Sequence, residues 1–402
     1  MKITSVDCMI IDSGDPCKGR NTWHPIVIRV NTDEGISGFG EAGVAYGRGY
    51  RAAFGMVQDF SELILGEDPM NIEKVWEKIY RKTFWGLGGG TIISAGMSAI
   101  DIALWDIKGK ALNVPIYQLL GGKSNDKLRA YASQLQFGWG PERIVPDRDL
   151  MITPEDYALV TKKVMEEGYT ALKVDPLALS DVLPDGRGPW QTRGILPEKN
   201  LRLAVDRVAA MREAGGPDMD IIIELHAYTD TTSAVQLGRE LEKYNIYYYE
   251  EPVHTLNPTN MLEVHRQLKM PIASGERIYG RTGFLPFLHN RSLQVVQPDV
   301  CLTGGISETK KICDMANAYD CSAQVHVCGS PISKAAALHV EAVIPNFIIH
   351  EHHGWALDPG CRKTCLYDYQ PENGYYKVPE LPGLGQELTP ETIDKAIKVT
   401  IK

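Results

Sequence analysis

The 402-residue chain lacks the features that mark membrane, secreted and nucleic-acid-binding proteins. No uninterrupted apolar stretch reaches the roughly 20 residues needed to span a bilayer, and the opening MKITSVDCMIIDS has no secretory h-region. Basic runs and low-complexity tracts are also absent, and the formal net charge is −9. This charge argues against nucleic acid and against an anionic membrane surface as partners. We therefore expect an ordinary globular, cytoplasmic protein.

The cysteines and glycines show no recognisable cofactor pattern. Eight cysteines occur without paired CxxC spacing, and Cys361 and Cys365 have no second pair or histidine spacing to complete a zinc site. We interpret them as reduced thiols and give none a role. The glycine runs at 86–90 and 303–307 lack the spacing of nucleotide-binding loops. The second run, TGGIS, opens a predicted helix, so its amides are a weak candidate for binding a substrate oxygen.

From residue 127 onward, apolar and β-branched runs alternate with amphipathic stretches of helical period. The eight runs are KLRAYAS (127–133), ALKVDP (171–176), IIIELHA (221–227), YYYEEP (247–252), PIASGER (271–277), LQVVQPDV (293–300), SAQVHVC (322–328) and FIIHEHH (347–353). Eight strands alternating with helices over about 240 residues predict a closed (β/α)8 barrel rather than an open sheet. Polar residues gather at the carboxyl ends of the runs, where barrel active sites are built.

The remaining sequence predicts two further parts. Residues 1–125 read as an α+β unit, with an antiparallel meander followed by helices within 67–85 and 94–112. Residues 126–370 then form the barrel, and the irregular segment 371–402 is expected to return to the N-terminal unit. Within the barrel, residues 177–196 form a long stretch without period, which is typical of a lid, a specificity loop or a subunit contact.

Three glutamates recur at a fixed interval near the ends of three successive runs. Glu224, Glu250 and Glu276 stand 26 residues apart, about the length of one strand, one helix and two loops. Side chains at the carboxyl ends of neighbouring parallel strands converge at one end of a barrel. Converging carboxylates repel one another unless a cation lies among them, and hard oxygen ligands favour Mg²⁺. The spacing therefore predicts one Mg²⁺ per subunit.

Two histidines are predicted near the same end of the barrel. Residues two apart on a strand share a face, which places His226 beside Glu224, either as an acid or base or as a hydrogen-bonded structural residue. Asp299 and His326 end neighbouring runs, and a carboxylate bonded to one ring nitrogen raises the basicity of the imidazole. A buried structural pair is the alternative. The position at the catalytic end favours a general base at His326.

The second and eighth runs supply further polar side chains. Strand alternation divides the histidine-rich stretch 350–353 between two faces, so Glu351 is predicted to hydrogen-bond in the pocket and the histidines are given no role. Lys173 and Asp175 share a face at the end of the second run and are candidates for contacting the substrate. The lysine either offers charge to an oxyanion or neutralises the nearby carboxylates. Glu251 points away from the trio and is expected to pair with a cation.

Together these residues resemble the mandelate racemase and muconate-lactonising branch of the enolase superfamily over essentially the whole chain. The matching stretches are SAIDIALWDIKGKAL with LLGGK, the carboxylates of IELHA, YEEP and SGER, and then QPDVCLTGGISE and AQVHVCGSP. The His226 position and the Asp299/His326 pair are most similar to D-galactonate dehydratase-like acid-sugar dehydratases. The resemblance implies an α/β fold in which an N-terminal α+β capping domain, completed by the C-terminal tail, covers a modified, enolase-like (β/α)8-type barrel.

The resemblance also implies specificity residues and shows two departures. Loops at 12–24 and 44–50 would close on the substrate, so the candidate substrate-binding residues include His24, Tyr46 and Arg48. The first metal-ligand position is Glu224, where most relatives have Asp. The second run has Asp175 where racemases and muconate-type enzymes carry a second lysine, which argues against two-base racemisation.

The activity implied is that of a lyase, a Mg²⁺-dependent dehydratase that converts an aldonate-type sugar acid to a 2-keto-3-deoxy acid. The metal would stabilise an enediolate, His326 would remove the α-proton with Asp299 as its partner, and His226 would protonate the departing β-hydroxyl. The alternatives are an epimerase, racemase or cycloisomerase acting on a related carboxylate, or a catalytically degenerate binding protein. The expected partners are a small carboxylate substrate and further copies of the chain in a homo-oligomer, with neither nucleic acid nor membrane.

Overall fold

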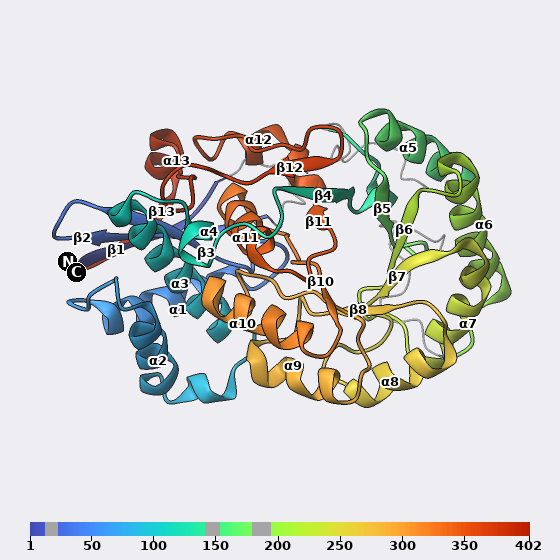
Figure 1. Cartoon of the computed structure of the whole chain (residues 1–402), viewed down its shortest axis with the longest axis horizontal. Coiled ribbons are helices and arrows are strands. Elements are labelled where there is room, and N and C mark those ends of the chain that lie inside the picture. The colour runs from blue at the N-terminus through green and yellow to red at the C-terminus, as the bar shows by residue number, and fades with distance from the viewer. Residues whose placement is uncertain (13–22, 141–152, 179–193) are drawn as a thin grey trace.

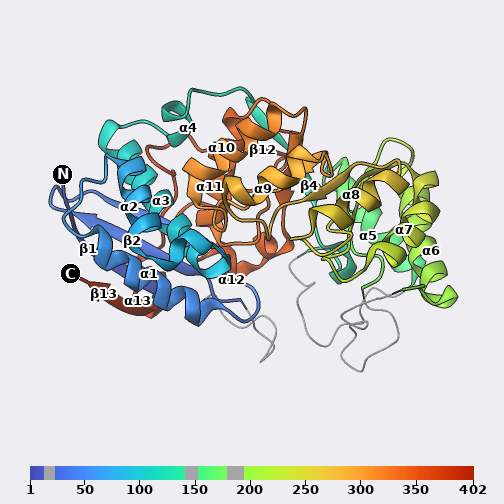
Figure 2. The same cartoon turned by 90° about the horizontal axis from the view of Figure 1, so that it is seen from below.

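The computed structural model describes residues 1–12, 23–140, 153–178 and 194–402. Two parts of the chain lie next to each other in Figure 1, an N-terminal part at the left and a barrel part that extends to the right. The two termini lie at the same end of the N-terminal part in both Figures 1 and 2. They share this end because the last strand pairs with the first.

The N-terminal part combines a small antiparallel sheet with helices, as predicted. Its elements are β1 (Ile3–Ile10), β2 (Ile26–Thr32), β3 (Ser37–Ala42), α1 (Tyr50–Ile64), α2 (Ile72–Lys82), η1 (Trp85–Gly88), α3 (Thr91–Leu112) and α4 (Ile116–Leu119). Neighbouring strands β1, β2 and β3 form an antiparallel meander. Helices α2 and α3 are the two that the sequence predicts, whereas α1 is additional to them.

Helix α3 joins the capping sheet to the barrel because it packs against β3 on one side and against barrel helix α10 (Gly305–Asn317) on the other. Most of its side chains are buried, which explains why it is rich in small and apolar residues rather than amphipathic. Two glycines of β3 allow this close packing. A Cβ at Gly38 or Gly40 would overlap the backbone oxygen of Ala103 or Ala99, respectively.

Eight parallel strands form the barrel, and each overlaps one of the eight predicted runs, with β6 and β7 beginning one residue earlier than predicted. They are β4 (Lys127–Ala132), β5 (Ala171–Val174), β6 (Asp220–Glu224), β7 (Ile246–Glu250), β8 (Ile272–Ser274), β9 (Val295–Val296), β10 (Ser322–Ala323) and β11 (His350–His352). Their order around the sheet is β10-β9-β8-β7-β6-β5-β4-β11. A parallel bridge between Ala323 and Phe347 links the two ends of this order.

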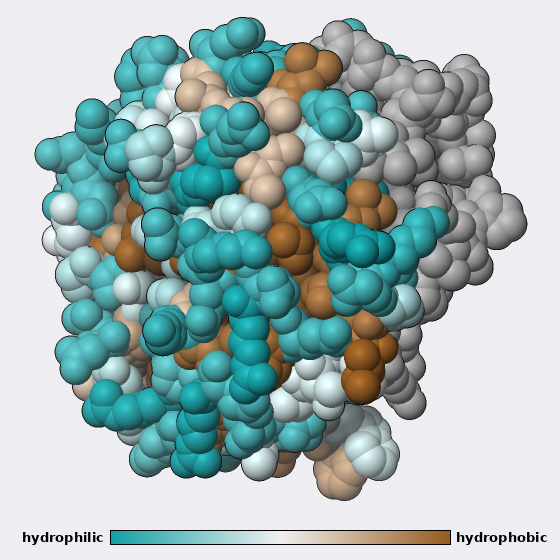
Figure 3. Space-filling model, turned by 90° about the vertical axis from the view of Figure 1, so that its right-hand side faces the viewer, coloured by the Kyte–Doolittle hydropathy of each residue, from teal (hydrophilic) through white to brown (hydrophobic). Residues whose placement is uncertain are grey.

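Helices and short helical turns connect the strands. They are η2 (Leu135–Phe137), α5 (Pro154–Glu166), α6 (Glu198–Gly215), α7 (Thr231–Leu241), η4 (Glu242–Tyr244), α8 (Pro258–Gln267), α9 (Gly280–His289), α10, α11 (Pro331–Val343), η5 (Gly354–Leu357) and α12 (Pro359–Arg362). Helices α5 to α8 run along the outer edge of the barrel in Figure 1. The described part of that outer face is mostly hydrophilic in Figure 3, as expected of helices that bury only one side.

Local sequence signals explain where several of these helices begin. Helix α5 starts with a capping box between Thr153 and Asp156, followed by a proline in its first turn. Helix α7 starts with a similar reciprocal pair, Asp230 and Ser233. These caps satisfy backbone N–H groups that have no partner inside the helix.

The barrel interior is filled by side chains, so it is a packed core rather than a pore. The cluster inside the ring of strands consists of Tyr131, Ala171, Ile222, Tyr248, Ala273, Val295 and Ile349. A larger apolar cluster lies between the strands and the surrounding helices, and another lies within the capping part. Among the described helices, none is both long enough and apolar enough to cross a bilayer.

The C-terminal segment contacts both parts of the molecule. Strand β12 (Tyr375–Lys377) first pairs antiparallel with β4 of the barrel. After α13 (Pro390–Lys395), strand β13 (Ile397–Ile401) pairs with β1 and becomes an outer strand of the capping sheet. The tail thus returns to the N-terminal part as predicted, while the boundaries near residues 125 and 370 stay predictions.

Candidate active site

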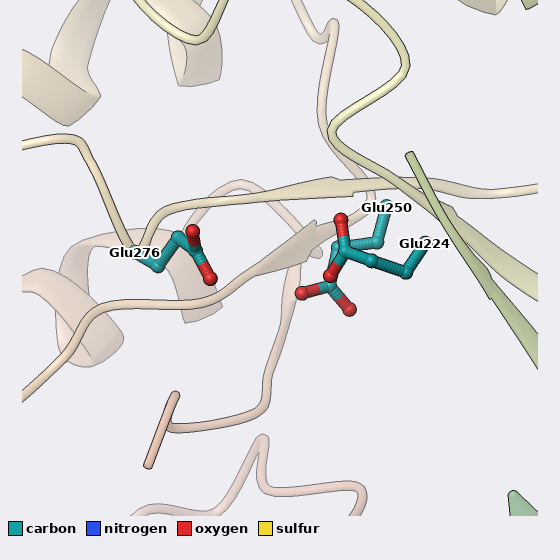
Figure 4. Close-up of side chains that lie close together, drawn as sticks. All are labelled: Glu224, Glu250 and Glu276. Carbon is teal, nitrogen blue, oxygen red and sulfur yellow. The ribbon is translucent and has the colours of Figure 1, made fainter. Parts of the chain in front are cut away.

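The three glutamates converge at the carboxyl ends of three neighbouring strands. Glu224 and Glu250 are the last residues of β6 and β7 and are paired in register, while Glu276 follows β8. One oxygen of each carboxylate lies within 4.8 Å of the other two, and Figure 4 shows the carboxylates turned toward a shared space. Oε2 of Glu250 is buried and has no hydrogen-bond partner among the described residues. This oxygen-only donor set, with one oxygen unsatisfied, fits a divalent cation.

The charges of the trio show why a cation suits this position. Burial and the neighbouring Glu224 raise the pKa of Glu250 well above its usual value. Burial also opposes ionisation of Glu224, but the charges of His226 and Lys173 outweigh it and lower the pKa to about 2. Two buried carboxylates in contact cannot both ionise at low cost without a positive charge between them. A bound cation would allow all of the trio to be ionised.

Lys173 lies between three carboxylates, two of the trio and that of Glu351. Its ammonium is 2.9 Å from Oε1 of Glu250, 3.3 Å from Oε2 of Glu224 and 3.1 Å from Oε1 of Glu351. Only 1% of the side chain is exposed. Because three carboxylates surround this ammonium, the geometry favours the neutralising role for Lys173 over direct contact with a substrate oxyanion.

Asp299 and His326 form the pair that the sequence predicts. Their backbones make a parallel bridge, and Nδ1 of His326 lies 2.7 Å from Oδ2 of Asp299. The other ring nitrogen, Nε2, lies 3.0 Å from Oε2 of Glu276. Burial lowers the pKa of His326, but the carboxylates of Glu276 and Glu351 reverse this and raise it well above the usual value. The imidazole thus has one nitrogen held by Asp299 and the other directed at the trio.

Glu351 lies in the same pocket, as predicted. Its carboxylate accepts hydrogen bonds from Oγ of Ser133 at 2.7 Å and from the backbone N–H of Val327 at 3.1 Å.

The neighbouring histidines of β11 turn away from Glu351. His350 pairs with Glu341 of helix α11, with Nδ1 and Oε2 2.5 Å apart. Nδ1 of His352 lies 3.1 Å from each of two tyrosine hydroxyls, those of Tyr169 and Tyr376. Neither histidine contributes to a metal site with Glu351.

His226 lies beside the trio, but not for the reason that the sequence suggests. Strand β6 ends at Glu224, and His226 has a left-handed backbone with φ of 49°, so strand alternation does not apply to it. Instead, the backbone N–H of His226 donates to Oε1 of Glu224 at 2.7 Å. Its Nδ1 lies 3.4 Å from Oδ2 of Asp175. Burial opposes protonation, but the charges of Glu224 and Asp175 raise the pKa of His226 to about 9.

Two glutamines of the pocket were not predicted from the sequence. Nε2 of Gln134 lies 3.3 Å from Nε2 of His226, and Oε1 of Gln134 accepts from Gln136 at 2.6 Å. Oε1 of Gln136 in turn accepts the backbone N–H of Asp175 at 3.2 Å. These residues connect the ends of the first two barrel strands to His226. Their position directly after the first run, in ASQLQ, is the signal that would have found them.

Two other predictions have clear outcomes. Glu251 pairs with a cation as expected, since the Arg277 guanidinium binds its buried carboxylate. The prediction that the TGGIS amides bind a substrate oxygen is not supported for two of them. The N–H of Gly304 donates to Oγ of Ser98 and that of Ser307 donates to Asp101, and both acceptors belong to α3. These two amides are already bonded to buried side chains of the capping part.

The capping part reaches the barrel beside the end of β11. Trp23 stacks on Trp355 with ring centroids 4.8 Å apart, and Trp355 lies in η5, just after β11. Trp23 also forms an antiparallel bridge with Tyr46. The segments at residues 23 and 46 therefore lie together near the Glu351 side of the barrel.

The three candidate specificity residues lie in or next to these segments. His24 donates its backbone N–H to the oxygen of Ala45 at 2.7 Å, and its ring lies 4.3 Å from that of Tyr50. Tyr46 is 53% exposed, and Arg48 is also exposed. Their roles stay predictions. Most of the loop at 12–24, as well as residues 179–193 of the loop at 177–196, lies outside the described residues.

Comparisons with known sequences identify the family. Residues 17–121 match the family described as "Mandelate racemase / muconate lactonizing enzyme, N-terminal domain", and residues 156–392 match "Enolase C-terminal domain-like". The chain belongs to the mandelate racemase and muconate lactonizing enzyme family of the enolase superfamily. This is the family that the motifs predict, and the protein is therefore an enolase-superfamily enzyme.

Individual members of this family are similar over nearly the whole chain. A member of the enolase superfamily from Salmonella Typhimurium has a solved structure that is 55% identical, with a TM-score of 0.93 and complete coverage of both chains. D-galactonate dehydratase of Pectobacterium atrosepticum is 33% identical over 91% of this chain and 89% of its own length. D-gluconate/D-galactonate dehydratase of Picrophilus torridus is 29% identical over 98% of this chain and 94% of its own length.

Proposed function

We propose that the protein is a Mg²⁺-dependent dehydratase of an aldonate-type sugar acid and releases a 2-keto-3-deoxy acid. The observation that supports this most is the placement of two imidazoles at one carboxylate trio, each with its own aspartate partner. His326 has Asp299 at 2.7 Å, and His226 has Asp175 at 3.4 Å. Elimination of water needs both a base for the α-proton and an acid for the β-hydroxyl, and this arrangement supplies both.

Glu224, Glu250 and Glu276 would hold the metal. When bound there, Mg²⁺ would supply Lewis-acid neutralisation of charge on the substrate carboxylate as the adjacent carbon loses its proton. Lys173 would offset the negative charge of the buried carboxylates that the metal leaves uncompensated, because its ammonium already contacts Glu224 and Glu250. With its charge offset by the metal, Glu276 would hold a proton on Nε2 of His326 less strongly.

The protein side chains would move the protons. Nε2 of His326 would take the α-proton, because Nδ1 is engaged by Asp299, which holds the ring in one orientation. Nε2 of His226 would donate a proton to the β-hydroxyl, so that the C–O bond breaks and water leaves. The C–H electron pair becomes the new C=C bond, and the resulting enol becomes the ketone. Gln134, 3.3 Å from this nitrogen, would move or exchange its partner when the substrate binds.

A screen of aldonic and aldaric acids with Mg²⁺ tests the proposal. D-galactonate and D-gluconate come first, because relatives named for these substrates align over most of the chain. We expect semicarbazide to detect a 2-keto acid product. The His326→Asn enzyme should neither form this product nor exchange the α-proton with deuterated water.

The possible outcomes separate the proposal from its alternatives. Retained α-proton exchange in His326→Asn would disprove the role of this residue as the base. Exchange or inversion without a carbonyl product in the wild-type enzyme would indicate an epimerase or cycloisomerase. If no acid in a wide library is turned over in the presence of Mg²⁺, the result would favour a catalytically degenerate binding protein.

A further inference from the structure

The two residues of the proposed base pair lie at the starts of short connections that lead into helices. Asp299 is followed by α10, which begins at Gly305, and His326 is followed by α11, which begins at Pro331. In both cases, the first turn of the helix contacts a buried carboxylate of the capping part rather than solvent. The position of the base pair therefore depends on contacts outside the barrel.

The first of these carboxylates is Glu41, near the end of β3, which is fully buried. Its Oε1 accepts the backbone N–H of Ser330 at 2.9 Å, and its Oε2 accepts the hydroxyl of Ser330 at 2.6 Å and the N–H of Ser333 at 3.2 Å. Ser330 caps α11 and lies four residues after His326. A Cβ at Gly329 would overlap the Ser333 side chain and come within 2.9 Å of Oε1 of Glu41, so this close packing requires glycine.

The second carboxylate is Asp101 of α3, which is 2% exposed. Its Oδ2 accepts the N–H of Ser307 at 3.0 Å, and its Oδ1 accepts the hydroxyl of Ser307 at 2.6 Å. A Cβ at Gly305 would overlap the Asp101 side chain. One residue after β3, the N–H of Gly43 donates to the oxygen of Cys301 at 2.9 Å, two residues after Asp299. The end of β3 therefore contacts both connections.

We propose that Glu41 and Asp101 are positioning residues for the base His326 and its partner Asp299, an inference that rests on the proposed function. Each joins a serine hydroxyl and a backbone N–H of one helix start to the capping part. A carboxylate is also the side chain best suited to accept several N–H groups at a helix N-terminus. The capping part thus holds the base pair in place from behind, in addition to covering the substrate.

Precise placement matters because proton transfer requires the base to be within hydrogen-bond reach of the α-proton. One end of the His326 connection is held by strand β10 and the other by Glu41. In Glu41→Gln, the amide NH₂ would face an N–H or O–H donor of Ser330 or Ser333, so at least one hydrogen bond would be lost. The connection would then be free to shift, and Nδ1 of His326 would move relative to Asp299.

The test compares two buried carboxylates of the capping part that differ in what they contact. Glu41→Gln loosens the His326 connection. Asp106→Asn is the matched control, because Asp106 is fully buried and accepts the N–H groups of Phe39 and Leu384 but contacts neither connection. Ser330→Ala, which removes the hydroxyl that donates to Glu41 and accepts from the Ile332 N–H but keeps both backbone donors to Glu41, is a second variant in case Glu41→Gln does not fold.

The measurement is the ¹⁵N chemical shift of the His326 ring nitrogens in the full-length protein with Mg²⁺. The chain has ten histidines, so the His326 signals can be identified by their loss in His326→Asn. We expect these shifts to change in Glu41→Gln, and by less in Ser330→Ala, but not in Asp106→Asn, even if all three lower the melting temperature. With a sugar acid that the wild-type enzyme dehydrates, kcat of Glu41→Gln should fall on the order of tenfold to a hundredfold, with little change in KM.

This design separates the inference from the proposed function, because the spectra need no turnover. Unchanged His326 shifts in both Glu41→Gln and Ser330→Ala would overturn the positioning role, as would equal changes in Asp106→Asn. If the shifts change as expected but no acid sugar is dehydrated, then the positioning role stands and the dehydratase proposal fails.

Discussion

His226 has a backbone conformation that few residues other than glycine adopt. Its φ is 49° and that of Ala227 is 56°, in the left-handed region where a Cβ is strained. Such strain persists only where surrounding contacts maintain it. Here the N–H of His226 bonds to Glu224, while Nδ1 lies 3.4 Å from Asp175. We interpret this turn as the feature that directs the imidazole toward the trio.

The proposed division of roles between the two histidines predicts separable defects. In His226→Asn, the acid is lost but His326 and Asp299 are untouched, so α-proton exchange with deuterated water should continue. Formation of the keto acid should fall by about 10²–10⁴-fold, the usual contribution of a general acid. Proton NMR of the recovered substrate measures the exchange, and the semicarbazide assay measures the product.

His326→Asn is the comparison, because it should lose both reactions. If His226→Asn lost exchange as completely as His326→Asn, then the two residues would not have the separate roles of acid and base.

The sequence was informative about the residues whose placement follows from strand ends. Glu224, Glu250 and Glu276 could be predicted because one repeat length brings each to the same end of neighbouring strands. The contacts of His226 could not, because the strand has already ended and a left-handed turn sets its direction. The contact between Gln134 and His226 depends on the register of segments that are 92 residues apart, which no local pattern encodes.

At the scale of elements, the contact between α3 and α10 predicts a pH-dependent stability. Burial raises the pKa of Asp101 to about 7, despite its bonds to Ser307. In the unfolded chain, this carboxyl has its ordinary pKa of 3.8. The raised folded-state pKa means that the contribution of Asp101 to stability is fully present below pH 3.8 and is lost as pH rises through about 7.

Asp101→Asn does not titrate, so it isolates this effect. Relative to the variant, the wild-type protein should lose on the order of 2 to 3 kcal/mol of unfolding free energy between about pH 5 and about pH 8. Urea unfolding of both proteins at the two pH values measures the difference, and titration of all other groups cancels. A constant difference between the proteins would contradict the raised pKa.

The elements themselves were largely predictable, but their contacts with one another were less so. All eight strands overlap apolar runs whose composition and spacing are local properties of the chain. No local pattern indicated that the amides of Gly304 and Ser307 are bonded to Ser98 and Asp101 of α3, about 200 residues earlier in the sequence. Helix starts that a distant side chain caps cannot be distinguished locally from open anion sites.

At the scale of the whole molecule, the first and last strands of the chain belong to the same sheet. Strand β13 completes the capping sheet beside β1, so the first and last segments belong to one part. Between them, the barrel presents the carboxylate trio and the base pair at the carboxyl ends of its strands. The capping part contacts the barrel through Glu41, Asp101 and the stacked Trp23 and Trp355.

The carboxylate trio is proposed to bind one divalent cation per chain. Glu250→Gln tests this proposal cleanly, because glutamine has the same shape but replaces one carboxylate oxygen with an amide nitrogen. Burial and Glu224 raise the pKa of Glu250 and so oppose its ionisation, and the metal-free variant should therefore lose little stability. Glu251→Gln is the matched control, since this buried neighbour pairs with Arg277 instead of joining the trio.

Calorimetric titration of the metal-free proteins with Mg²⁺ is the most direct measurement. We predict one Mg²⁺ per chain for the wild type and for Glu251→Gln, and binding at least about 100-fold weaker for Glu250→Gln. Mg²⁺ should accordingly raise the melting temperature of the first two proteins and not of the third. Equal Mg²⁺ affinity in Glu250→Gln and the wild type would contradict the account.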